Sequence, residues 1–106
     1  MAVSASGPEI IDAEMRFSPD SATYNFAVTV RHDDSGWDHY ADRYEIRSLE
    51  GAVLGVRVLA HPHVDEQPFT RSVGGIHIPK DLTYVLIRGR DNKGIYGEDK
   101  KIRIEP

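Results

Sequence analysis

Residues whose types suit binding or catalysis gather in two short stretches of the chain. The stretch HPHVDEQPFTR, residues 61–71, carries two histidines two positions apart, followed by two carboxylates. The stretch RHDDSGWDHYAD, residues 31–42, carries two more histidines among four aspartates and two aromatic residues. Imidazole and carboxylate groups are the usual nitrogen and oxygen ligands of zinc, copper(II) and nickel. A divalent metal site is therefore one hypothesis for these stretches.

The spacing of His61 and His63 fits such a site. In an extended segment the two side chains project to the same side, about 6–7 Å apart, so both imidazoles can face one ion. The predicted metal ligands are His32, His39, His61 and His63, with copper(II) or zinc as the cofactor. Pro62 restricts the backbone on both sides, however, and histidines that only hydrogen-bond to loop backbone explain the same residues. Both interpretations stay open.

Recognition of a partner is the second hypothesis. Trp37 and Tyr40 offer rigid aromatic contact area, and neighbouring carboxylates offer charge. The predicted ligand- or partner-binding residues are Asp34, Trp37, His39, Tyr40, Glu66 and Arg71. A structural interpretation competes with this one, and it is favoured for two residues: Trp37 as a lid over the end of the core, and His32 as a partly buried, hydrogen-bonded imidazole. Similarly, Phe69 is expected in the core, and Arg71 is expected to brace the loop by pairing with Asp65 or Glu66.

Composition limits what the chain can be. Its 106 residues suit one domain, and 17 acidic against 13 basic residues leave no basic surface for nucleic acid. The absence of cysteine excludes disulfides and thiolate metal sites. No apolar run reaches the length of a membrane span, so no membrane insertion is expected. We expect residues 1–8 to be a flexible leader without the features of a secretory signal, and residues 9–106 to form a single domain.

Alternating apolar residues predict strands rather than helices along the whole chain. In TYNFAVTVRH, for example, Tyr24, Phe26, Val28 and Val30 share one face. The other inward faces predicted in this way are Ile11, Ala13, Met15 and Phe17; Tyr40, Tyr44 and Ile46; Leu54, Val56, Val58 and Ala60; Ile76 and Ile78 on either side of His77; Val85, Ile87 and Gly89; and Ile102 and Ile104. The sequence therefore predicts an all-β, immunoglobulin-like or fibronectin type III-like antiparallel β-sandwich of about seven strands.

The order of these strands brings distant segments together. Consecutive antiparallel strands place their connections alternately at the two ends of a sandwich. The connections at residues 32–39, 61–71 and 92–99 therefore fall at one end, with four of the five histidines. The glycines of SVGGIH, with no helix after them, indicate a bulge or bend in a strand.

The segments VTVRHDDSGWDHYADRYEI and LGVRVLAHPHVDEQPFTRSVGGIHIP resemble those of a family of small exported bacterial β-sandwich proteins. The resemblance covers roughly residues 23–97. It implies an exported, periplasmic single sandwich, and it implies no particular activity or ligand. Because residues 1–8 lack the features of a secretory signal, a cytoplasmic location is the alternative. In that family a histidine often stands where this chain has Gly94, a departure that weakens any metal site needing the third loop.

The function predicted from the sequence is a non-enzymatic binding or accessory module. It recognises a protein or a small ligand through the loops at one end, as a monomer or weak dimer. The alternative is a divalent metal carrier or sensor that uses the loop histidines. An enzyme is not expected, because the chain has no nucleophile elbow, phosphate-binding loop or His-Glu-x-x-His helix.

Overall fold

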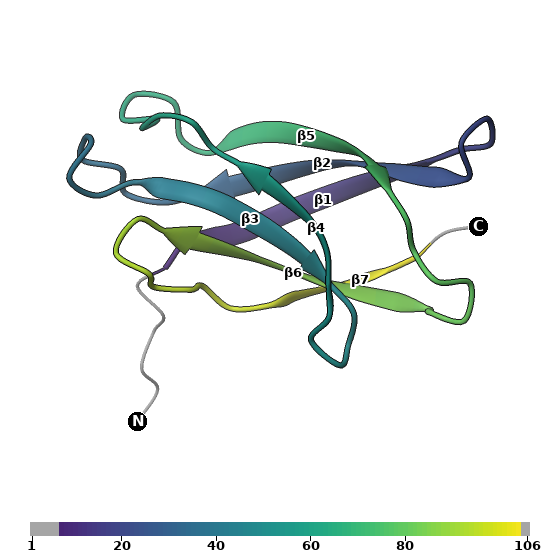
Figure 1. The fold of residues 1–106 in the computed structure, drawn as a ribbon. Helices are drawn as coiled ribbons and strands as arrows, with labels where there is room; N and C mark the ends of the chain where they lie inside the picture. The colour runs from purple at the N-terminus through teal and green to yellow at the C-terminus, as the bar shows by residue number, and fades with distance from the viewer. Residues whose placement is uncertain (1–6, 105–106) are drawn as a thin grey trace.

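A computed structural model describes residues 7–104, and these form two antiparallel sheets packed face to face (Figure 1). One sheet has the order β1-β2-β5 and the other the order β4-β3-β6-β7. The predicted all-β sandwich of seven strands is confirmed. The strands are β1 (Glu9–Ser18), β2 (Thr23–Arg31), β3 (Ala41–Arg47), β4 (Val53–Val58), β5 (Phe69–Ile76), β6 (Tyr84–Asp91) and β7 (Lys100–Arg103).

The core lies between the sheets and is built from the alternating residues of their central strands. Phe26, Val28 and Val30 of β2 are at most 1 % exposed, and so are the inward residues of β3 and β6. Burial of this apolar surface is the main stabilising contribution to a sandwich of this kind. Phe69 is also buried, as predicted.

β-Bulges correct the predicted faces of β1 and β3. In β1 the register shifts at Ile11, so that Ile10 pairs with Val30 while Asp12 pairs with Thr29. The extra residue places Ile10, rather than Ile11, in the core. In β3 a shift between Ala41 and Arg43 buries Ala41 instead of Tyr40.

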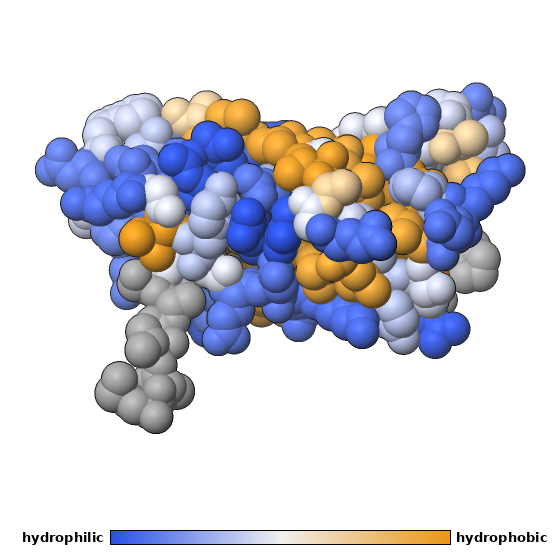
Figure 2. All heavy atoms as spheres, turned by 60° about the horizontal axis from the view of Figure 1, so that its bottom comes forward, coloured by the Kyte–Doolittle hydropathy of each residue, from blue (hydrophilic) through white to orange (hydrophobic). Residues whose placement is uncertain are grey.

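The predicted inward face of β4 is right only for Leu54, which packs against the core, and is wrong for the other three residues. Val56 and Val58 are 40 % and 65 % exposed, whereas Leu59 is buried and Gly55 packs against Ile76. β4 is an edge strand with apolar residues on both faces, so its sequence does not specify which face turns inward. Figure 2 shows hydrophobic residues gathered over the middle of the side that includes the four-stranded sheet, with polar residues towards both ends.

The fifth strand begins earlier than predicted. It covers Phe69–Ile76, so Arg71 lies within a strand and His77 lies just beyond its end. Gly75 has a φ of 70°, and the pairing of β2 with β5 shifts between Tyr24 and Phe26. The bulge predicted from SVGGIH is therefore confirmed.

The start of the described chain is packed rather than free. Pro8 is fully buried, and a side chain at Gly89 or Gly97 would overlap it. The predicted leader is therefore wrong for Gly7 and Pro8, and its first six residues lie outside the described part.

The three connections predicted to meet do meet. The β2–β3, β4–β5 and β6–β7 connections lie together at the left of Figure 1, and the other three turns lie towards the opposite end. Within residues 7–104, no helix is long and apolar enough to cross a membrane.

Candidate functional site

Asp34 joins the first two connections at this end. Its side chain is fully buried, and one carboxylate oxygen accepts hydrogen bonds from His32 Nδ1 at 2.6 Å and from the backbone N–H of Ala41 at 3.0 Å. The other oxygen accepts the backbone N–H of His63 at 2.8 Å. One carboxylate therefore satisfies donors from residues 32, 41 and 63, and the two histidine-bearing segments are spatial neighbours, as predicted.

Two amide side chains complete the bracing. Gln67 accepts the backbone N–H of His32 at 3.0 Å and donates to the carbonyl of His63 at 2.9 Å. Asn92, after β6, accepts the backbone N–H of Tyr40 at 3.0 Å, and its Nδ2 lies 3.2 Å from the carbonyl oxygens of Trp37 and Asp38. Because these bonds join all three connections, the loop end is held in one arrangement.

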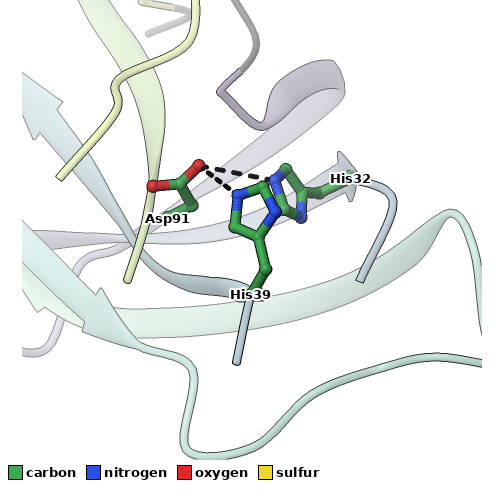
Figure 3. Close-up of side chains that lie close together, drawn as sticks. All are labelled: His32, His39 and Asp91. Carbon is green, nitrogen blue, oxygen red and sulfur yellow. Dashed lines mark hydrogen bonds and ion pairs between the residues drawn. The ribbon is translucent and has the colours of Figure 1, made fainter. Parts of the chain in front are cut away.

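His32, His39 and Asp91 form a cluster beside this bracing (Figure 3). His39 Nε2 lies 2.8 Å from Asp91 Oδ2, and His32 Nε2 lies 3.6 Å from the same oxygen. Each residue offers one potential ligand atom, and the three atoms lie within 4.8 Å of one another. Within residues 7–104, this is the group of histidine and carboxylate side chains that could hold a metal ion. His32 and Asp91 are buried, whereas the side chain of His39 is about one-third exposed.

The surroundings of Asp91 favour its charged form. Burial acts to raise the pKa of this carboxyl. The hydrogen bond from His39 and the backbone N–H groups of Ile95 and Lys93 outweigh burial and hold its pKa below its ordinary value. A carboxylate that stays ionised in a buried position is suited to hold a cation or a protonated imidazole.

His61 and His63 make a separate pair. Their ring centroids are 4.6 Å apart, and the ring of His63 stacks on Phe69 at 3.9 Å. Both ring nitrogens of His63 are buried without a hydrogen-bond partner, and burial, followed by the charge of Arg71, lowers the pKa of this imidazole. His61 Nδ1 turns to the carbonyl of Pro62. The four predicted metal ligands therefore fall into two groups rather than one.

Trp37 of the β2–β3 loop faces solvent, whereas Tyr40 is half-buried. Trp37 is 67 % exposed and meets Tyr40 edge to face, with ring centroids 5.5 Å apart. The prediction that Trp37 covers the core is wrong, whereas the prediction of a buried, hydrogen-bonded His32 is confirmed. Arg71 pairs with Glu66 at 3.1 Å, which is the bracing contact expected for the β4–β5 loop.

Sequence reasoning missed Asp91, Gln67 and Asn92 as parts of this end. Asp91 had a usable signal, because it continues the inward phase of Val85, Ile87 and Gly89. The same rule placed His32 after Val30. Gln67 and Asn92 lie in irregular connections, where alternation gives no information.

The chain is similar to a known protein over most of its own length. No protein-family model matches the chain, and no solved structure matches it. A protein of Halomicrobium mukohataei named "Putative lipoprotein" is 40 % identical to it over 88 residues. These residues are 83 % of this chain but 42 % of that protein, so the chain spans less than half the length of this relative.

Proposed function

We propose that this domain is a non-enzymatic binding or accessory module that acts outside the cytoplasm and recognises a protein through its loop end. The exported location is supported by the name of the Halomicrobium mukohataei relative, "Putative lipoprotein". The recognition role is supported by the exposure of Trp37 on a braced loop. The resemblance of the two histidine-bearing segments to small exported sandwich proteins agrees with the proposed location.

The exposed indole is the observation that carries the proposal. Trp37 leaves two-thirds of its surface in water although a tryptophan gains more than most side chains from burial. Its loop is held by Asp34 and Asn92, so little conformational entropy remains to be lost when a partner covers it. Rigid aromatic side chains of this kind are frequent energetic centres of protein interfaces.

The surroundings of Trp37 suit a protein rather than a small molecule. Tyr40 extends the aromatic surface, and the Glu66–Arg71 pair adds charge to the β4–β5 connection, which lies at the same end. Small ligands prefer concave pockets of about 300–1,000 Å³. A hollow of about 200 Å³ does exist, but residues of β1, β2 and β5 such as Glu14, Asn25 and Ser72 line it, and the loop end does not.

Affinity capture from the envelope fraction of the producing cells tests the proposal. The immobilised domain should retain a discrete partner, and Trp37→Ala should weaken its binding by about 30-fold, the effect of a 2 kcal/mol interface residue. Leu49 is a matched control because it is 50 % exposed in the turn between β3 and β4, at the opposite end. Equal capture by wild type, Trp37→Ala and Leu49→Ala would contradict recognition through the loop end.

A further inference from the structure

We infer that His32, His39 and Asp91 form a zinc(II) site, with His32 Nε2, His39 Nε2 and Asp91 Oδ2 as the protein ligands. This site goes beyond the recognition of a protein, and it differs from the histidine pair that the sequence pattern first suggests. The inference depends on the positions of the three ligand atoms, on the groups that orient them and on the balance of buried charge.

The positions of the ligand atoms suit zinc. For metal–ligand bonds of about 2.1 Å in tetrahedral geometry, neighbouring ligand atoms stand about 3.4 Å apart. Asp91 Oδ2 lies 2.8 Å from His39 Nε2 and 3.6 Å from His32 Nε2. The ligand atoms of all three residues lie within 4.8 Å of one another, so small movements of His39, whose side chain is partly exposed, would bring the separations to this value. With three protein ligands, the fourth position of a tetrahedral zinc site would be left for a water molecule.

Groups outside the cluster orient two of the three ligands. Asp34 accepts a hydrogen bond from His32 Nδ1, so Nε2 is the ring nitrogen that faces Asp91. At 3.6 Å from that carboxylate, Nε2 is beyond hydrogen-bond distance although the side chain is only 4 % exposed. Asp91 Oδ1 accepts two backbone N–H groups, so Oδ2 is the oxygen turned to the histidines. A carboxylate that fixes the tautomer of a ligating histidine is a regular feature of zinc sites.

The balance of charge also favours a divalent ion. The side chains of Asp34 and Asp91 are fully buried, and within residues 7–104 their ionic partners are His32 and His39 alone. Both carboxylates accept backbone hydrogen bonds, but among these residues no lysine or arginine side chain pairs with either of them. A zinc ion would add positive charge at the point where Asp91 and the two imidazoles converge. Nitrogen and carboxylate ligands without thiolates agree with zinc(II).

Calorimetric titration of the whole chain with zinc chloride near neutral pH tests the site. The wild type should bind one equivalent, and His39→Ala should lower the affinity by about 100-fold or more. His39 is chosen because its partial exposure lets the variant fold, which circular dichroism verifies. His61→Ala is the matched control, since it removes a histidine from the same end but outside the cluster, and its affinity should stay within about twofold of the wild type.

Cobalt(II) reports the geometry independently. The visible absorption of a four-coordinate cobalt site should appear with the wild type and His61→Ala and be absent with His39→Ala. Failure of the wild type to bind zinc stoichiometrically would overturn the inference, and His39 would then act only as a hydrogen-bond donor to Asp91. Loss of binding in His61→Ala with retention in His39→Ala would also overturn it. Neither result bears on protein recognition, which depends on Trp37.

Discussion

Replacement of Asp34 by alanine should remove the hydrogen bonds that hold the loop end together. The loss in the free energy of unfolding follows from the contacts of this side chain. The side chain accepts three hydrogen bonds, from His32 Nδ1 and from the backbone N–H groups of Ala41 and His63. Each buried donor left without a partner costs about 1–3 kcal/mol. Because water enters part of the space, we expect a loss of about 3–5 kcal/mol in the free energy of unfolding, the range for breaking a buried charged contact.

Asp33 supplies the control for this measurement. It is the neighbouring residue and has the same side chain, but it is exposed. Asp33→Ala should change the stability by less than about 0.5 kcal/mol, as surface substitutions do. Urea denaturation followed by circular dichroism gives both values from the transition midpoint and slope. If Asp34→Ala proves no more destabilising than Asp33→Ala, the carboxylate does not tie the loops together, and the reasoning from its contacts is refuted.

Three further results are expected. Burial lowers the pKa of His63 in the folded state below its ordinary 6.5, so the unfolded state binds the proton more readily and the free energy of unfolding should fall as the pH drops through about 6.5 and below. In denaturation curves measured at several pH values, His63→Phe should make the free energy of unfolding depend less on pH. An unchanged pH dependence would exclude His63 as its source. Tyr44→Phe should lower the free energy of unfolding by about 1–2 kcal/mol, because the buried hydroxyl donates a hydrogen bond to the carbonyl of Arg71 at 2.9 Å and its removal leaves that acceptor without a donor. A thermal melt identical to that of the wild type would show that water replaces the bond. Trp37 is the chain's one tryptophan and is 67 % exposed, so its emission should resemble that of an indole in water and be quenched readily by acrylamide, whereas blue-shifted, protected emission would mean that the ring is packed.

The parts of the fold that follow from strict alternation could be predicted from the sequence. Phe26, Val28 and Val30 on β2, and Val85 and Ile87 on β6, face inward as the pattern requires. Chain direction alone then placed the histidine-bearing connections at one end. Both inferences depend on the two-residue period of a strand, which is a geometric constant.

Alternation failed where the backbone departs from that period or where both faces are apolar. The bulge at Ile11 shifts the alternation of inward and outward side chains within β1, and no residue type in that strand indicates it. In β4 the apolar run at an edge left the inward face undetermined, and Val58 turned out to be exposed. Glu45, on the outer face of β3, is nonetheless buried, and the hydroxyl of Tyr96 from the β6–β7 connection lies 3.4 Å from its carboxylate.

In the candidate site too, strand alternation predicts some positions, whereas others depend on the conformation of the loops. His32 and Asp91 sit at the ends of β2 and β6, where the inward phase of each strand runs on past its apolar residues. Their proximity could therefore be inferred from strand pattern and direction. The separation of His63 from this cluster could not, because it depends on stacking against Phe69 inside an irregular connection. The exposure of Trp37 likewise depends on loop conformation.

Photo-crosslinking in the producing cells tests most directly the claim that the loop end is the working surface. A photoreactive phenylalanine analogue would replace Trp37 in one variant and Leu49, at the opposite end, in another. The account predicts a discrete crosslinked protein with the variant at position 37 and none with the variant at position 49. Crosslinks of equal yield at both positions, or a discrete product at position 49 alone, would contradict it.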